Sequence, residues 1–417
     1  MRVLFLGINY PPEEIGIGLY SGDMCRAWAE MGHDVHAVVA VPYYPAWKVP
    51  PEYAGWGWTR SSDDGVEITR CPIYVPREPS GARRILHHLS FLASSLAPMI
   101  GSALRKKPDL VFTSAPSLIA APVAWLAARL RGAKCWLHIQ DFEVDAMLAT
   151  GLVKGQMASR LGAAFERWVF RRFDVVTSIS PQMCRKLSEK GVVREKIYEL
   201  RNWADVERVR PLEGPSPFRE EWDIGSRHVA LYSGNIANKQ GIEIVLEAAR
   251  ALRHRTDITF VVCGEGPNRE NLERAAADLD NIQFHDLQPR ERLGDLLGMA
   301  TVHLMPQLAT AADLLLPSKL TNMLASGRPV VATAEEGTGL AAEVAGCGLV
   351  SPPGDPAAFA EAIEWIIDHP EDARTFGEAG RIRAEERWSR NAILGAAEQR
   401  MELLVGRAAW ARGPGRH

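Results

Sequence analysis

The chain has 417 residues, 47% of them hydrophobic, which is too long for a single core and rich enough in apolar side chains to fill two. A formal net charge of −3 excludes a general nucleic-acid-binding protein, whose surface would be strongly basic. The six cysteines lack the spacing of zinc ligands or of a disulfide framework, which indicates reduced, packed thiols in a cytosolic protein.

Short apolar segments alternate with longer amphipathic ones, which is typical of parallel strands joined by helices. The apolar stretch at the N-terminus is too short for a signal peptide and is interpreted as a buried first strand. In the first half the pattern predicts strands at 3–8, 35–41, 66–74, 110–113, 135–139, 175–179 and 197–200. The turn-rich segment PLEGPSP follows at 211–217 and is interpreted as part of a linker.

After this segment the strand pattern restarts, with strands predicted at 229–233, 258–263, 282–285, 301–305 and 330–334. We therefore predict two doubly wound, Rossmann-like α/β domains that face a central cleft, with the ligand at the strand ends. The predicted parts are a domain at 1–210, a linker at 211–225, a second domain at 226–385, a helix at 386–405 that crosses back to the first domain, and a disordered tail at 406–417.

Residues 85–104 are largely apolar and have basic residues at both ends, Arg83 and Arg84 before them and 105–107 after them. Such a helix can lie on an anionic membrane surface, or it can be an ordinary helix between two strands with solvated ends. His87 and His88 interrupt the apolar run, so a transmembrane helix is not predicted. Both interpretations stay open. The expected location is the cytoplasm, and the membrane-surface interpretation adds a peripheral association with the inner membrane.

The first strand is followed by NYPPEEIGIG at 9–18 and then by a helical pattern. Gly16 and Gly18 would let the backbone approach a phosphate or a sugar at the start of this helix. A dinucleotide-binding fold would need a tight glycine turn directly after the first strand and an acid at the end of the second. Neither is present, which argues against a nicotinamide enzyme.

Residues 211–417 contain only two lysines, Lys239 and Lys319, and each lies between a predicted strand and a helix. A compact ammonium group at a helix N-terminus suits a phosphate, whereas two ordinary surface lysines are the alternative. Ser318 precedes Lys319 at the start of its helix, so the free amides there could receive a diphosphate.

Glycines end the two predicted strands that come first in this half of the chain. Gly234 and Asn235 follow one strand, and Gly264, Glu265 and Gly266 follow the next. Because parallel strands end at the same edge of a sheet, these glycines would form an open floor on which a nucleotide can lie.

Three segments resemble motifs of the retaining nucleotide-sugar glycosyltransferases of family 4: LHIQDFEVDA at 137–146, SGNIANKQG at 233–241 and LPSKLTNMLASGRPVVATA at 316–334. The closest likeness is to the bacterial exopolysaccharide, colanic-acid-type transferases, and it covers nearly the whole chain. The resemblance implies the GT-B fold, a UDP- or GDP-sugar as donor, a polyprenyl-diphosphate-linked glycan as acceptor, and no separate cofactor.

The chain departs from the family pattern at the nucleotide site. The family usually has two glutamates around the last of these helices, and Leu314, beside Asp313, and Asn322 stand in their places. Asn322 can still bond a ribose hydroxyl, and it completes the expected donor-binding set together with Leu320. The usual arginine after the Ser-Gly turn is replaced by Asn235, so Lys239 would carry more of the phosphate charge.

His138 and Asp141 follow the apolar core of the strand at 135–139 and are the catalytic candidates that the resemblance implies, positioning hydroxyls of the donor or acceptor. A histidine at a strand end can equally be a packed core residue. Because no paired carboxylates are evident, we expect no protein nucleophile. The resemblance implies instead that the departing diphosphate accepts the proton of the acceptor.

Asp278 and Asp280 could hold a divalent ion on a sugar diphosphate, but they close a helix far in sequence from the lysine turns. We interpret them as solvated turn acids and expect turnover without a metal. Aromatic residues crowd the loop after the second strand, and Tyr43, Tyr44 and Trp47 are the candidates for stacking on an acceptor sugar. A small satellite core under that loop is the alternative.

The resulting hypothesis is a retaining glycosyltransferase that extends a lipid-linked glycan in exopolysaccharide biosynthesis. Two alternatives stay open. One is a nucleotide-sugar epimerase on the same fold, and the other is a non-catalytic nucleotide-binding partner in a polysaccharide assembly complex, which the missing glutamate would favour.

Overall fold

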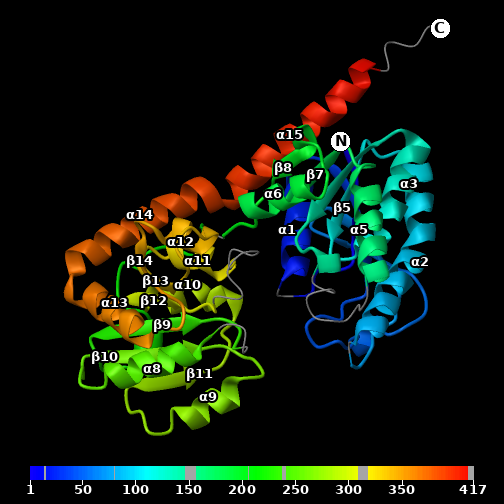
Figure 1. The fold of residues 1–417 in the computed structure, drawn as a ribbon. Coiled ribbons are helices and arrows are strands. Elements are labelled where there is room, and N and C mark those ends of the chain that lie inside the picture. The colour runs from blue at the N-terminus through cyan, green and yellow to red at the C-terminus, as the bar shows by residue number, and fades with distance from the viewer. Residues whose placement is uncertain are drawn as a thin grey trace, which may run out of the picture. The chain divides into compact units, whose positions relative to one another are not determined.

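The computed structural model describes residues 1–13, 16–78, 80–145, 156–204, 206–236, 241–308 and 318–411. The chain forms two compact units, one made of Met1–Arg201 with Leu394–His417 and the other of Asn202–Ile393. Each unit is built on its own sheet with helices packed on it (Figure 1).

The sheet of the N-terminal unit has the strand order β3-β4-β2-β1-β5-β6-β7-β8. All neighbours in it pair in parallel except β3 and β4, which are antiparallel. The order reverses between β1 and β5, which is where doubly wound folds bind ligands at the carboxyl ends of their strands. The strands are β1 (Arg2–Gly7), β2 (Asp34–Ala40), β3 (Thr59–Asp63), β4 (Val66–Cys71), β5 (Leu110–Ala115), β6 (Lys134–Ile139), β7 (Val175–Ser178) and β8 (Ile197–Glu199).

The helices of this unit start and end where local chemistry allows. Ser180 accepts a hydrogen bond from the backbone nitrogen of Met183 at 3.2 Å and so begins α6. Gly132, in the left-handed region with φ +63°, ends α3. The helices are α1 (Ile17–Glu30), α2 (Gly81–Lys106), α3 (Ala121–Arg131), α5 (Gln156–Phe170) and α6 (Pro181–Glu189), with short 3₁₀ turns η1 (Pro51–Tyr53), η2 (Leu118–Ala120) and η3 (Arg194–Lys196).

The sheet of the C-terminal unit is parallel throughout, in the order β11-β10-β9-β12-β13-β14, which reverses between β9 and β12. Leu231 packs into the apolar core on one face of this sheet and Tyr232 into the core on the other, as the alternation of side chains along a strand requires. The strands are β9 (His228–Ser233), β10 (Ile258–Cys263), β11 (Ile282–His285), β12 (Val302–Met305), β13 (Val330–Thr333) and β14 (Gly348–Ser351).

The segment 211–225, interpreted as a linker, contributes to the C-terminal core. It contains α7 (Phe218–Glu221), and Phe218 is fully buried, because the Ser216 hydroxyl fixes the preceding turn by donating to the backbone oxygen of Asp295 at 2.7 Å. The other helices of the unit are α8 (Glu243–Ala251), α9 (Arg269–Ala275), the 3₁₀ turn η5 (Arg290–Arg292), α10 (Leu293–Gly298), α11 (Ser318–Ala325), α12 (Gly339–Val344), α13 (Pro356–Asp368) and α14 (Pro370–Trp388).

The last helix, α15 (Arg390–Ala411), starts among residues of the C-terminal unit and groups with the N-terminal unit from Leu394 onward. The Glu398 carboxylate lies 3.2 Å from Nε2 of His33 in that unit. The helix extends to Ala411, so the first residues of the expected disordered tail are helical, and the rest of that tail lies outside the described residues. Within the described ranges no helix is long and apolar enough to cross a membrane.

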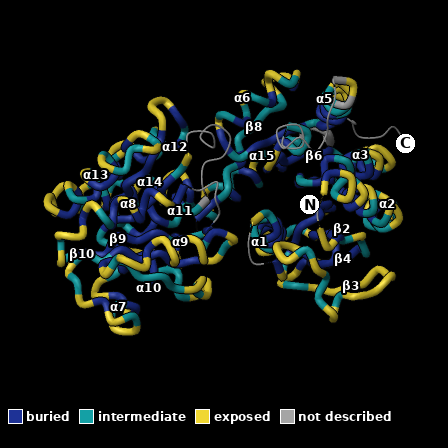
Figure 2. Tube along the Cα trace, turned by 60° about the horizontal axis from the view of Figure 1, so that its bottom comes forward, coloured by how far each residue is buried: buried dark blue, intermediate teal, exposed yellow. Residues whose placement is uncertain are grey.

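The two predicted α/β domains with largely parallel sheets are confirmed, and two strands were missed. The strand β3 has the polar sequence TRSSD and is an exposed edge strand (Figure 2). The strand β14 has the short sequence GLVS directly after a glycine turn. Neither provides the apolar run on which the strand predictions depended.

Candidate active site

The carboxyl ends of β9 and β10 form a floor of backbone next to the point where the strand order reverses, between β9 and β12. A Cβ atom on Gly264 would lie 1.9 Å from the backbone oxygen of Gly234, and one on Gly266 would lie 2.2 Å from that of Ile236. The loops therefore touch backbone to backbone, and only glycine fits at these two positions. The predicted glycines Gly234, Gly264 and Gly266 thus lie together and add no side chains of their own to this floor.

Lys319, in the first turn of α11, lies against this floor. Its Cδ atom is 3.3 Å from the position of a Cβ on Gly234, and its Nζ is 4.2 Å from the centre of the Tyr232 ring. The Nζ atom is buried and has no hydrogen-bond partner among the described residues. Burial lowers the pKa of Lys319 to about 7. A buried ammonium group without a partner is unfavourable, and an anion would relieve that cost.

Asn322 lies one helical turn after Lys319, so both side chains share a face of α11. The Oδ1 atom of Asn322 is buried and also has no partner within the described part of the chain. Leu320 lies on the opposite face, fully buried in the apolar core with Met323 and Leu324. Only the backbone of Leu320, and not its side chain, could therefore face a ligand.

Of the remaining predicted donor-site residues, Asn235, Glu265 and Ser318 lie within the described part of the chain. Asn235 accepts a hydrogen bond on its backbone oxygen from the Tyr232 hydroxyl at 2.7 Å. The Glu265 carboxylate accepts one from Arg269 at 3.1 Å. Ser318 is the first residue of α11, and Lys239 lies outside the described residues.

In the N-terminal unit, the loop after β1 is closed by a buried carboxylate. Glu13 Oε1 accepts hydrogen bonds from the backbone nitrogens of Tyr43 and Tyr44 at 3.1 and 3.0 Å, and Glu13 Oε2 accepts one from Asn9 at 2.9 Å. A Cβ on Gly18 would lie 2.8 Å from Glu13 Oε2. The loop therefore uses the small size of Gly18 for its own packing, while Gly16, with φ +70°, precedes the first turn of α1.

His138 lies inside β6 and is buried. Its Nδ1 is 3.0 Å from Thr177 Oγ1, which accepts from the Trp136 indole at 2.9 Å. The Thr177 hydroxyl is nearer to this Nδ1 than to the backbone oxygen of Leu137, at 3.4 Å, so we assign its proton to the histidine contact. Burial lowers the pKa of His138 to about 3, which leaves a neutral imidazole with its proton on Nε2.

Asp141 is exposed in the bend directly after β6. Glu143, two residues on, was not among the predicted residues although it lies in the same motif. Its Oε1 accepts hydrogen bonds from the backbone nitrogens of Ser117 and Leu118, the latter at 3.0 Å, and burial raises its pKa to about 7. Only the proximity of the η2 turn shows this role, and that proximity is not visible in the sequence.

The aromatic residues expected at the acceptor site have different environments. Tyr43 is 6% exposed, and its ring packs edge-on against His87 and Trp47, with centroids 4.5 and 5.4 Å apart. This packing forms the small satellite core that was the alternative interpretation, and it leaves the ring of Tyr43 unavailable for stacking. Tyr44 is 41% exposed, and Trp47 is half-buried beneath the guanidinium group of Arg84.

The acids considered for a metal are engaged in surface ion pairs. Asp278 pairs with Arg250 at 3.3 Å and Asp280 with Arg253 at 3.2 Å. Within the described ranges, no group of three histidine, cysteine or acidic residues could hold a metal ion.

Comparison with known protein families identifies the family to which the chain belongs. The family described as "Glycosyl transferase 4-like domain" matches residues 16–203, and "Glycosyl transferases group 1" matches residues 217–383. The chain belongs to these glycosyltransferases, which confirms the resemblance seen in its motifs.

Named relatives agree with this assignment. The chain is 42% identical over 348 residues to the "Putative colanic acid biosynthesis glycosyl transferase WcaI" of Escherichia coli (strain K12), covering 82% of this chain and 85% of the relative. It is 26% identical to the 2-deoxystreptamine glucosyltransferase of Streptomyces kanamyceticus, covering 82% and 89% of the two chains.

Solved structures support the GT-B fold. The sucrose-phosphate synthase of Thermosynechococcus elongatus superposes with a TM-score of 0.72 at 19% identity, covering 97% of this chain and 99% of its own. Anabaena Alr3699/HepE in complex with UDP and glucose superposes with a TM-score of 0.68 at 15% identity, covering 96% and 99%. At these identities the likeness concerns the fold alone.

Proposed function

We propose that the protein transfers a sugar from a UDP- or GDP-sugar to a lipid-linked glycan in exopolysaccharide biosynthesis, with retention of configuration and without a metal. The observation that carries the proposal is Lys319, whose enclosed Nζ lies beside the backbone floor at Gly234 and has no hydrogen-bond partner among the described residues. A diphosphate would give this ammonium group the anionic oxygens that it lacks. The colanic acid named for the relative WcaI supports the polysaccharide part of the proposal.

In the proposed donor complex the nucleotide lies over Gly264 and Gly266, which have no side chains of their own to obstruct it. The diphosphate binds Lys319 and the free amides at the start of α11, a helix whose first turn favours anions. Asn322 bonds a ribose hydroxyl, and Lys239 adds a second positive charge. The UDP named in the HepE complex supports a nucleoside diphosphate as the ligand.

In the proposed reaction the acceptor hydroxyl oxygen forms a bond to the anomeric carbon while the bond from that carbon to the diphosphate oxygen breaks. The acceptor proton passes to the departing diphosphate, and Lys319 and Lys239 stabilise the negative charge that grows there. His138, kept neutral by burial, is a hydrogen-bond donor through Nε2 rather than an acid or base. We assign to it and to Asp141 the positioning of sugar hydroxyls.

A lipid-linked acceptor is supported by an apolar groove in the N-terminal unit. The groove has a volume of about 460 Å³ and is lined mostly by apolar residues of α2, η2, α3 and α5, among them Leu89, Leu92 and Phe165, and also by Glu143. Leu89 and Leu161 beside it are 44% and 65% exposed. Apolar surface of this kind next to the basic ends of α2 suits a lipid chain with an anionic head group. Tyr44 would stack on the glycan part of the acceptor.

Metal independence is tested by measuring activity in excess chelator. We expect unchanged turnover, because the two lysines and the α11 amides neutralise the diphosphate. Loss of activity that magnesium or manganese restores would contradict this part of the proposal and would direct attention back to Asp278 and Asp280.

The whole proposal is tested by a screen of nucleotide-sugar donors that records released nucleotide with and without a lipid-linked acceptor. We expect release that depends on the acceptor, and a glycosylated product whose anomeric configuration matches that of the donor. A converted sugar nucleotide without acceptor would instead identify an epimerase. Nucleotide binding without release under any condition would identify a non-catalytic partner.

A further inference from the structure

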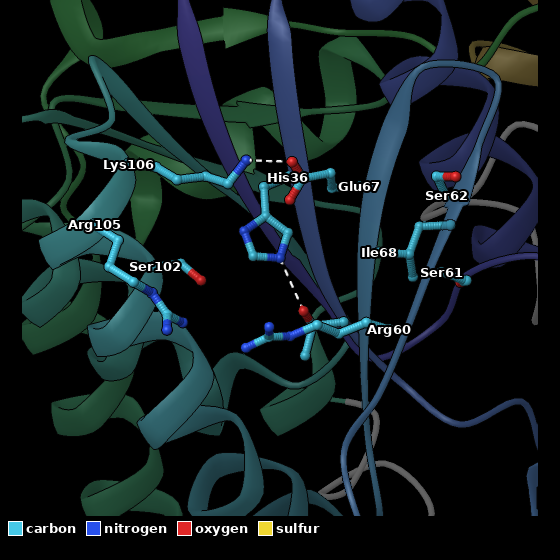
Figure 3. Close-up of a pocket in the computed structure, with 10 residues that line it drawn as sticks. His36, Arg60, Ser61, Ser62, Glu67, Ile68, Ser102, Arg105 and Lys106 are labelled. Carbon is cyan, nitrogen blue, oxygen red and sulfur yellow. Dashed lines mark hydrogen bonds and ion pairs between the residues drawn. The ribbon is translucent and has the colours of Figure 1, made fainter.

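The N-terminal unit has a polar pocket at the opposite end of its sheet from His138 and Asp141. It lies between the β3–β4 hairpin and the last turn of α2 and has a volume of about 570 Å³ (Figure 3). His36 and Glu67, which pair across β2 and β4, lie near the amino ends of these strands. The residues assigned to catalysis lie at the carboxyl ends, so the pocket is separated from them by the length of the strands.

The pocket has two exposed arginines, one of which, Arg60, acts on Glu67 and helps to lower its pKa. Lys106 is paired, with its Nζ 2.7 Å from Glu67 and 3.7 Å from Asp34. Arg60 on β3 and Arg105 on α2 have no ion-pair partner within the described part of the chain. In Figure 3 both guanidinium groups are turned toward the space that Ser102 and His36 also face.

The imidazole of His36 is the buried part of this pocket. The residue is 7% exposed, and its Nε2 lies 2.9 Å from Thr69 Oγ1. Its Nδ1 is buried without a hydrogen-bond partner among the described residues. Buried polar atoms in proteins nearly always have a partner, so an unpartnered nitrogen beside two exposed guanidinium groups indicates a site that a ligand completes.

We propose that this pocket binds a small phosphate monoester of about the size of a sugar phosphate, at a site distinct from the donor site. Guanidinium groups match the paired oxygens of a phosphate, and the serine hydroxyls can bond the hydroxyls of a sugar. The pocket adjoins the carboxyl end of α2, whose partial negative charge opposes an anion. Binding therefore depends on both Arg60 and Arg105.

The charge state of His36 couples this site to pH. Burial, followed by the charges of Lys106 of α2 and Arg60 of β3, lowers the pKa of His36, whereas Glu67 of β4 and Asp34 of its own strand raise it, and the net pKa is about 4. A bound dianion favours the protonated imidazole and raises this pKa. Affinity for an anion of constant charge should therefore increase as the pH falls from about 7 toward about 5.

The test uses histidine-ring NMR of the full chain, with His36 assigned by its loss in His36→Gln. Glucose 1-phosphate represents a soluble sugar phosphate. Sulfate, whose charge is constant over this pH range, is used to measure how anion affinity depends on pH. In the wild type we expect a saturable shift of the His36 signal. The double variant Arg60→Ala/Arg105→Ala should lose affinity by at least about tenfold. The control Arg129→Ala, which removes an exposed arginine from the last turn of α3, should lose none. His36→Gln should bind sulfate, detected by calorimetry, with an affinity that no longer rises at low pH.

A lipid is the other source of a phosphate monoester, so vesicles with phosphatidic acid are compared with vesicles of phosphatidylcholine alone. Binding to the first that the double variant loses, without any response to glucose 1-phosphate, would assign the site to a lipid head group. Equal affinity of the double variant and the wild type for every probe, with matching thermal melts, would overturn the proposal. Absence of saturable binding to any probe by the wild-type protein would also overturn it.

Discussion

The candidate side chains near the carboxyl ends of the two sheets differ in whether they already have hydrogen-bond partners. In the N-terminal unit, Glu13 receives three hydrogen bonds within the loop, and His138 is bonded to Thr177. In the C-terminal unit, Lys319 Nζ and Asn322 Oδ1 are buried without a partner among the described residues. A satisfied loop holds its own shape, whereas unsatisfied groups against a bare backbone floor need a ligand to complete them.

The strongest test of this contrast concerns His138 and Asp141. If they position sugar hydroxyls, His138→Ala and Asp141→Ala should lower turnover by about 10²–10⁴ and hardly change nucleotide affinity. Steady-state kinetics with a calorimetric titration of the nucleotide separates these two quantities. A variant that melts early, or that keeps full activity, would make its residue a structural member of the satisfied N-terminal network.

The next largest effect is expected at Lys319. Lys319→Ala removes a charge-assisted bond worth about 1.5–3 kcal/mol, so affinity for UDP or GDP should fall about 10- to 150-fold. The free nucleoside has no phosphate to lose and should bind almost as before. Lys239→Ala is expected to act likewise and to cost more in turnover, since no arginine stands beside it in the Ser-Gly turn.

Calorimetry with the diphosphate and its nucleoside measures both effects, and thermal melts check folding. Arg274→Ala, which removes an exposed basic residue of the same unit, is the matched control. Unchanged diphosphate affinity in folded Lys319→Ala would mean that the C-terminal floor is not the phosphate site.

The N-terminal side of the comparison is tested at Glu13. Glu13→Ala leaves three donors unpaired, on Asn9, Tyr43 and Tyr44, and should lower the free energy of unfolding by about 1–3 kcal/mol. Diphosphate affinity should not change, because the donor groups lie in the other unit. Denaturant unfolding gives the first quantity, with the exposed Glu52→Ala as control. A loss of diphosphate affinity with unchanged stability would show that this loop binds the donor.

The smallest effect is a pH dependence of donor binding. Without ligand, Lys319 has a pKa of about 7, and a diphosphate favours its protonated form. Above that pH, binding must take up a proton, so affinity should fall about fivefold between pH 7 and pH 8. Proton uptake is measured by calorimetry in two buffers with different ionisation enthalpies. Lys319→Ala should show none, and equal uptake in both proteins would assign the proton to another group.

Strand positions were predictable wherever a strand is a buried apolar run, as in the segment VALY of β9 or FVVC of β10. The glycine floor was predictable for a related reason, since the turn that follows such a strand in a parallel sheet points to the ligand edge. The polar edge strand β3 gives no such signal, and so the pocket that it forms with α2 could not be anticipated.

The direction of side chains on α11 was only partly predicted. Leu320 was placed with the donor-binding residues by analogy with the family, although its spacing with Met323 and Leu324 marks the core face of the helix. The contact of Tyr232 with Lys319 and that of Glu13 with Tyr43 could not be predicted from the sequence. Each depends on a contact between segments that only the folded chain brings together.

The grouping of α15 with the N-terminal unit has a consequence for the order in which the protein can fold during synthesis. The ribosome releases Met1–Arg201 first, but the helix that completes this unit, with its buried Ala397 and Met401, is made last. The intervening unit, Asn202–Ile393, is continuous and can close as soon as it has emerged. The N-terminal unit is therefore the last to be completed, and a chain cut short before α15 would leave exposed the apolar surface that this helix covers.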